Sequence, residues 1–158
     1  MIPLFWLTLL AAAPIPDPCA MITKTEAQVL IGEPVTGTSK EPAEPDEDTG
    51  GIQTSCTFMG KTKALIVAVL EFKSAAEATK KITVEFLKSQ DKEAAPTIVP
   101  EPGLGDRAFF GHTTHSAMML AQKGARAYVA TVGGRFTAAT TTYRARLHTL
   151  VATMAAKG

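Results

Sequence analysis

The sequence has few cysteines, few aromatic residues and no long apolar run. Its 158 residues include two cysteines, one tryptophan and three histidines, and aromatic residues make up 6% of the chain. The longest uncharged apolar stretch, residues 1–13 (MIPLFWLTLLAAA), is shorter than the about 20 residues that a transmembrane helix needs. We therefore expect no transmembrane anchor in the mature protein.

The basic residues do not gather in any one segment. The formal net charge is +1, yet residues 1–60 carry eight acids and two bases, and residues 61–158 carry seven acids and fourteen bases. A nucleic-acid interface would show a dense basic stripe with aromatic residues between the bases. Because the bases here are dispersed, we expect no nucleic-acid partner.

Residues 1–13 are typical of a secretory signal peptide, because they are apolar and end in small residues. No Lys or Arg precedes the run, so an N-terminal strand or helix of a cytosolic domain stays the alternative. Residues 14–18 (PIPDP) form a stiff spacer. We expect an exported protein, periplasmic or extracellular, whose single globular domain covers residues 19–158.

The two cysteines, Cys19 and Cys56, are predicted to form a disulfide, because an exported protein matures in an oxidising compartment. Such a bond would stabilise the fold by roughly 3–4 kcal/mol. Two buried thiols in a reducing compartment are the alternative. Asp17 and Pro18 precede Cys19, where a lipidated cysteine would follow small residues, so we expect no lipid there.

Capping signals predict the first helices. Thr23 and Glu26 form a capping box that opens a short helix over 24–31, and Gly32 ends it. A second capping box at Ser74 opens a helix that runs to about residue 88. Residues 39–51 are acidic and rich in Pro and Gly, and are predicted to be a mobile surface loop.

The remaining pattern predicts an α+β fold. A long final helix covers residues 136–156, because its apolar residues recur on one side. Short turns between strands make the sheet antiparallel, and it packs against two long helices plus the short N-terminal one. The elements suggest a pseudo-repeat of strand–strand–helix halves. The predicted strands are 52–59, 64–72, 107–110, 116–122 and 125–132.

Three short motifs resemble a known group of proteins. Residues 18–35, Cys56-Thr57-Phe58 and residues 103–108 (GLGDRA) resemble small secreted bacterial domains of unknown function, of the actinobacterial lipoprotein type. The resemblance implies a PsbP-like sheet-and-helix sandwich. It implies no activity, because that group has no common catalytic residues.

The histidines and serines do not form a recognisable catalytic or metal-binding pattern. His112 and His115 are three positions apart, and no further Cys or acidic residue stands beside them to complete a metal site. No G-x-S-x-G motif is present. We therefore predict no metal, no cofactor and no enzymatic activity.

Two glycine-containing turns are candidate anion sites. Residues 103–106 (GLGD) precede a strand, so a tight turn is the better interpretation. Gly133, Gly134 and Arg135 precede the predicted last helix, where free amides, the helix dipole and a guanidinium would converge on a carboxylate or phosphate. These three residues are the anion-binding candidate, with an ordinary strand-to-helix reversal as the alternative.

The sequence leaves three functions open. The first is a non-enzymatic exported domain that binds a macromolecule or a component of the cell envelope. The second is a carrier of a small ligand or anion, which would use the cleft between the sheet and the loops at 103–106 or 133–135. The third is a hydrolase with dispersed catalytic residues. A deep apolar pocket with a few polar groups would favour the second.

Overall fold

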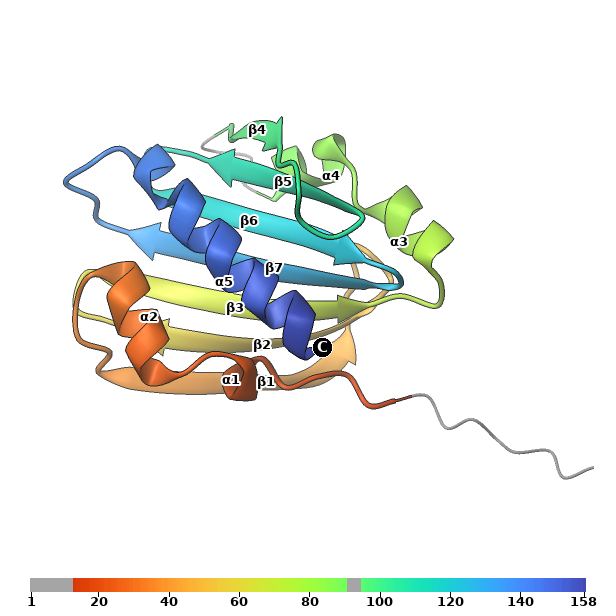
Figure 1. Cartoon of the computed structure of the whole chain (residues 1–158), viewed down its shortest axis with the longest axis horizontal. Helices are drawn as coiled ribbons and strands as arrows, with labels where there is room; N and C mark the ends of the chain where they lie inside the picture. The colour runs from red at the N-terminus through yellow and green to blue at the C-terminus, as the bar shows by residue number, and fades with distance from the viewer. Residues whose placement is uncertain (1–12, 91–94) are drawn as a thin grey trace, which may run out of the picture.

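Residues 13–90 and 95–158, which the computed structural model describes, form a seven-stranded antiparallel sheet with helices on both faces (Figure 1). Neighbouring strands follow the order β1-β2-β3-β7-β6-β5-β4. The predicted α+β class and the antiparallel sheet are therefore confirmed. The elements are α1 (Pro18–Met21), α2 (Lys24–Ile31), β1 (Gly37–Pro45), β2 (Ile52–Met59), β3 (Lys63–Glu71), α3 (Ala75–Lys81), α4 (Val84–Ser89), β4 (Thr97–Pro100), β5 (Arg107–His112), β6 (Ser116–Lys123), β7 (Arg126–Gly134), a 3-10 helix η1 (Thr140–Tyr143) and α5 (Arg144–Lys157).

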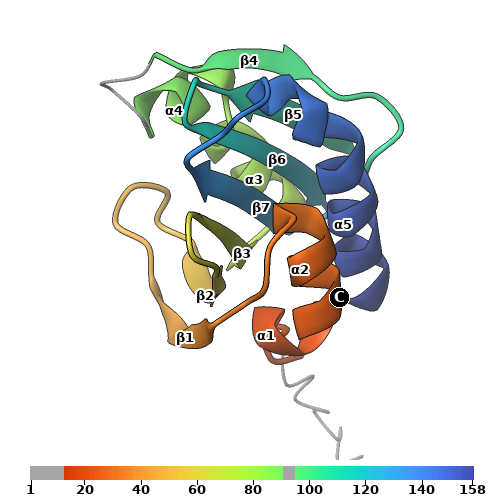
Figure 2. The ribbon, with the colours of Figure 1, turned by 90° about the vertical axis from the view of Figure 1, so that its left-hand side faces the viewer.

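The alternating side chains of strand β3 divide the core into two layers. Leu65, Val67 and Val69 point to the front face, where they pack with α1, α2 and α5. Leu70 points to the back face, where it packs with α3 and α4. Figure 2 shows the sheet between these two groups of helices. A strand that is buried on both faces reads as a nearly continuous apolar run, as β3 does.

Helix α2 forms where its capping residues predict it. The Thr23 hydroxyl accepts a hydrogen bond from the Glu26 amide at 3.1 Å, and the Glu26 carboxylate accepts one from the Thr23 amide at 2.7 Å. Gly32 ends the helix in the left-handed region, at φ 75°. Local hydrogen bonds therefore fix both ends of this helix.

The predicted long helix after Ser74 is wrong, because the segment forms two short helices. Ile82 takes an extended conformation after α3, and the Thr83 hydroxyl caps α4 by accepting from the Phe86 amide at 3.1 Å. The Arg107 guanidinium donates to the carbonyl oxygens of Thr79 and Ile82 at the end of α3. The break therefore has a local cause in Thr83 and a long-range cause in Arg107.

The last helix is predicted over 136–156, but in the structure it begins eight residues later, at Arg144. A 3-10 turn occupies Thr140–Tyr143, and α5 starts at Arg144. The Thr140 hydroxyl donates to the Thr113 carbonyl at 2.6 Å, so this turn is tied to the β5–β6 connection. The fold thus has one longer helix and several short ones in place of two long helices, and the pseudo-repeat of strand–strand–helix halves stays a prediction.

The predicted loop over 39–51 is wrong in its first part, because residues up to Pro45 belong to strand β1. Lys40 pairs with Cys56 and Glu41 with Ser55, and the register shifts between Glu41 and Glu44. The side chains of this strand from residue 38 onward are exposed, so it carries no apolar pattern. Prolines and charges at a sheet edge are tolerated where an inner strand would exclude them.

The predicted disulfide is confirmed, since Cys19 and Cys56 are bonded and their Cα atoms lie 5.1 Å apart. The bond ties α1 to β2, in the front layer of the core. The predicted leader over 1–13 lies outside the described residues except for Ala13. Within residues 13–90 and 95–158, no helix has both the length and the apolar character of a membrane span.

Candidate functional site

A cleft of about 490 Å³ opens on the back face of the sheet. Helix α3 packs on β6 and β7, and α4 packs on β4, so these two helices cover only part of this face (Figure 2). The cleft lies between α4 and the neighbouring strands. Its volume is within the range of about 300–1,000 Å³ that is usual for small-molecule sites.

Two rows of cross-strand neighbours make the floor of the cleft. Ile66, Thr131, Met118 and Gly111 follow one another across β3, β7, β6 and β5. The second row contains Ala68, Val129 and Leu120. The antiparallel register therefore brings together residues that lie up to 65 positions apart in the chain, as Ile66 and Thr131 do.

Most of the floor is apolar, and part of it faces solvent. Ile66 keeps 44% of its surface exposed, although it stands in the middle of a central strand. The α4 wall adds Phe86 and Leu87. Ile66 is exposed, Phe86, Met118 and Val129 are half-buried and Leu87 is buried, so the apolar surface of the cleft is only partly open to solvent.

Among the described residues, the polar part of the lining consists of glutamine, threonine, serine and one histidine. Gln53 on β2, Thr131 on β7 and Gln90 after α4 supply amide and hydroxyl groups. The hydroxyls of Thr113 and Ser116 lie 2.9 Å apart and bond to each other. The lining therefore suits a neutral, largely apolar molecule that carries a few hydrogen-bonding groups.

The helix required by the predicted anion site at Gly133, Gly134 and Arg135 does not begin there. Gly133 and Gly134 are the last residues of β7, and α5 starts only at Arg144. The Gly134 amide donates to the His115 carbonyl at 3.1 Å, and the Arg135 amide donates to the Thr62 carbonyl at 3.0 Å. These two amides are bonded within the fold, and no helix begins beside them, so they do not form a helix N-terminus that could bind an anion.

The GLGD segment is a tight turn, as the sequence indicates. Gly103 and Gly105 both have positive φ, at 75° and 61°. Leu104 between them is buried in the front core. The Asp106 carboxylate accepts a hydrogen bond from the Gly124 amide at 2.6 Å, which joins this turn to the β6–β7 hairpin. The segment is therefore structural, and it does not line the cleft.

The three histidines have separate surroundings. His112 is a residue of the cleft lining, but its ring stacks on Phe110 of the front core with ring centroids 5.6 Å apart, whereas His115 is exposed. His148 lies on α5, where its Nδ1 is 2.8 Å from a Glu101 oxygen. Among the described residues, no group of three or more His, Cys, Asp or Glu side chains is arranged to hold a metal ion.

Glu101 joins the segment after β4 to helix α5. Its carboxylate pairs with Arg144 Nε at 2.7 Å as well as with His148, and its side chain is only 9% exposed. Burial raises the pKa of Glu101, but the hydrogen bonds with His148 and Arg144 outweigh that effect and hold the pKa below its ordinary value. A carboxylate with a lowered pKa stabilises the fold above its ordinary pKa, and this contribution is lost as the pH falls through the lowered value.

Replacing Glu101 with Gln is therefore expected to lower the free energy of unfolding by about 1–2 kcal/mol at neutral pH. The difference from the parent protein should shrink as the pH falls through the lowered pKa of Glu101, because the parent then loses the same charge. Urea unfolding between pH 7 and pH 3 measures both effects. The exposed Glu85 on α4 provides the control Glu85→Gln, and a difference for Glu101→Gln that stayed constant across this range would contradict the assignment.

Sequence reasoning missed the cleft, because its lining has no local signal. Ile66, Ala68 and Leu70 sit in an apolar run that predicts a buried central strand, and this prediction is correct for β3. Only the incomplete cover by α3 and α4 leaves part of that strand open to solvent. The exposure of Ile66 follows from the break between these two helices and from their position on the sheet.

No known protein family and no curated protein matches this sequence. Among solved structures, the chain is similar to the crystal structure of the extracellular domain of PknH from Mycobacterium tuberculosis. That comparison has a TM-score of 0.48 and 10% sequence identity, and it covers 89% of this chain and 98% of the other. The resemblance to actinobacterial lipoprotein-type domains and the PsbP-like sandwich stays a prediction.

Proposed function

We propose that this protein is an exported, non-catalytic domain that binds a small, uncharged and largely apolar molecule in the back-face cleft. The observation that carries the proposal is the cleft itself, with about 490 Å³ of space over an apolar floor. This is the small-ligand alternative of the sequence analysis. Its site lies on the sheet, and residues 103–106 and 133–135 do not line it.

The chemistry of the lining supports binding without a reaction. Among the described residues that line the cleft, His112 is the one titratable residue, and its ring stacks on Phe110 in the front core. The hydroxyls of Thr113 and Ser116 are hydrogen-bonded to each other, and the Thr113 hydroxyl also accepts a hydrogen bond from the His115 amide at 3.1 Å. An activated nucleophile would instead need an oriented base beside it. The Cys19–Cys56 bond supports export, because such bonds persist in oxidising compartments.

The test uses a neutral fluorescent probe and a pair of matched substitutions. N-phenyl-1-naphthylamine is uncharged and becomes fluorescent in an apolar site, so the protein should bind it with a dissociation constant on the order of micromolar. Ile66→Asp places a charge on the cleft floor and should weaken binding by about tenfold or more. Met59→Asp is the control, because Met59 is similarly exposed, at 41% against 44%, but lies outside the cleft.

The two variants separate binding in the cleft from general stickiness. Thermal unfolding of both variants first establishes that each is folded. Equal loss of probe binding in Ile66→Asp and Met59→Asp would contradict the proposal, as would unchanged binding in Ile66→Asp. Displacement of the probe by neutral compounds such as long-chain alcohols, and not by fatty acids or alkylamines, would then define the ligand as uncharged.

A further inference from the structure

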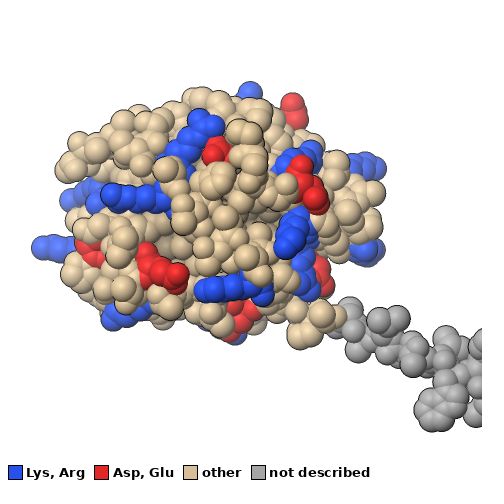
Figure 3. All heavy atoms as spheres, viewed as in Figure 1, with Lys and Arg blue, Asp and Glu red and all other residues tan. Residues whose placement is uncertain are grey.

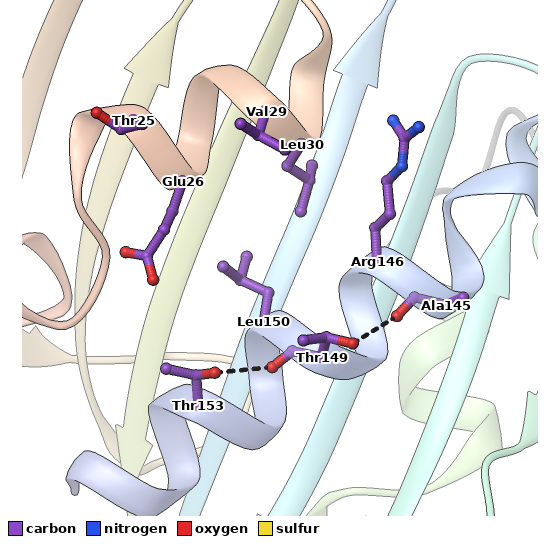
Figure 4. A pocket seen from close by; sticks show the side chains of 9 residues that line it. All are labelled: Thr25, Glu26, Val29, Leu30, Ala145, Arg146, Thr149, Leu150 and Thr153. Carbon is purple, nitrogen blue, oxygen red and sulfur yellow. Dashed lines mark hydrogen bonds between the residues drawn. The ribbon is translucent and has the colours of Figure 1, made fainter.

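A second apolar hollow lies on the opposite face of the sheet, between helices α2 and α5 (Figure 4). It has a volume of about 460 Å³. Leu30 and Leu150 form its floor and are nearly buried, at 3% and 7% exposure. Val29 stands on the α2 wall with 69% of its surface exposed, the highest value among the exposed large hydrophobic side chains of the described residues.

Two threonines make the α5 wall more apolar than its sequence indicates. The hydroxyls of Thr149 and Thr153 donate to the carbonyls of Ala145 and Thr149 at 3.1 and 3.0 Å, along their own helix (Figure 4). Because these donors are used within α5, the methyl groups remain to contact whatever enters the groove. Figure 3 shows uncharged atoms across the middle of this face, with charged side chains around them.

The two charged residues of the groove differ in whether they are already engaged. The Glu26 carboxylate accepts hydrogen bonds from the Thr23 amide and hydroxyl at 2.7 and 2.8 Å. Arg146, on the α5 side, belongs to none of the ion pairs among residues 13–90 and 95–158. Both side chains keep their charge, but among the described residues Arg146 is the one whose charge is not paired, so a carboxylate of a partner would bind at Arg146.

The shape of the groove suits a helix better than an extended strand. The lining residues of α5 run from Ala145 to Thr153, which corresponds to about 12 Å along the axis, or two turns of an opposing helix. Both walls are helices whose backbone groups are bonded internally, so an added strand would find no edge to pair with. A helix in a groove needs only side-chain contacts.

We propose that this groove docks an amphipathic helix of a partner protein, with its apolar residues on Val29, Leu30 and Leu150 and a carboxylate against Arg146. The partner helix carries apolar residues at positions i, i+4 and i+7 and an acidic residue beside them. A second copy of this chain fits less well, because a two-fold interface would place one hollow against another and Arg146 close to its own copy.

The experiment measures binding of a stapled helical peptide of about 16 residues with leucines at i, i+4 and i+7 and flanking glutamates. Its binding to the full chain is followed by fluorescence anisotropy and by amide chemical shifts, which should change at Val29, Leu30 and Thr149. Val29→Lys should weaken binding by about tenfold. Arg146→Glu should weaken it by about two- to fivefold and should favour a matched peptide with lysines in place of the glutamates.

Two controls make each outcome decisive. Met59→Lys and Ile66→Lys alter exposed apolar residues outside the groove and should leave peptide binding unchanged. No binding of the peptide, shifts confined to other surfaces, or equal losses in the control variants would overturn the proposal. So would concentration-dependent dimerisation in sedimentation that Val29→Lys abolishes, because the occupant would then be a second copy.

Discussion

Removing the Cys19–Cys56 disulfide is expected to lower the free energy of unfolding by about 4 kcal/mol. The two cysteines are 37 positions apart. In the chain-entropy account, closing a loop of that length lowers the conformational entropy of the unfolded chain and so stabilises the folded state. A domain of this size has a total stability of about 5–15 kcal/mol, so one bond supplies a large share of it.

The position of the bond adds a contribution from the folded state. Cys56 is fully buried in β2, and Cys19 lies on α1, a helix of only four residues. Besides the disulfide, the segment with α1 is held by packing of Met21 and Ile22 in the front core and by a hydrogen bond from Lys157 Nζ to the Met21 carbonyl at 2.6 Å. Without the covalent tie, α1 should detach first and expose the end of the front core.

The double variant Cys19→Ala/Cys56→Ala measures this effect, because it leaves no free thiol to react. Compared with the parent protein, the variant should have a lower urea midpoint. Its amide hydrogen exchange should be accelerated more in residues 18–22 than in β3. The parent protein in a reducing agent should behave in the same way. A loss below about 1 kcal/mol would mean that packing of α1 alone fixes this end of the fold.

Local hydrogen bonding explains which parts of the fold could be predicted from the sequence. The ends of α2 depend on Thr23, Glu26 and Gly32, which lie within one short segment. The apolar run of β3 identifies a central strand, because such a strand is covered on both faces. Both features need no knowledge of distant residues.

Contacts between distant residues explain what the sequence could not predict. The end of α3 depends on Arg107, and strand β1 forms because its backbone pairs with β2 while its side chains stay in solvent. The cleft needs the register of four strands at once. At Gly133 and Gly134, the same residue pair fits a strand end or a helix start, and only the carbonyls of His115 and Thr62 decide between them.

Gly105→Ala is expected to destabilise the protein by about 2–5 kcal/mol, the sum of a backbone and a steric cost. Gly105 has φ 61°, a conformation that costs an alanine about 1–2 kcal/mol. A Cβ atom there would also overlap the carbonyl oxygen of Gln122. That oxygen cannot move freely, because it accepts a hydrogen bond from the Asp106 amide at 2.7 Å.

The same carbonyl belongs to a residue whose side chain holds α3 on the sheet. The buried Gln122 side chain donates from Nε2 to the Ala75 carbonyl at 3.1 Å and accepts from Arg107 Nε at 2.8 Å. Moving Gln122 to relieve the overlap would therefore disturb the hydrogen bonds that hold α3 on the sheet. Relieving the overlap would disturb hydrogen bonds whether Gly105 or Gln122 moves, so we expect Gly105→Ala to have its full destabilising effect.

Gly103→Ala, two residues earlier in the same turn, separates the two costs. Gly103 also has positive φ, at 75°, but a Cβ atom there would meet nothing within 4 Å. Its replacement should cost about 1–2 kcal/mol, the backbone term alone. Urea unfolding of both variants should place Gly105→Ala clearly below Gly103→Ala. Equal losses would mean that the turn can move away from β6, and the Asp106–Gly124 hydrogen bond would then not hold it in place.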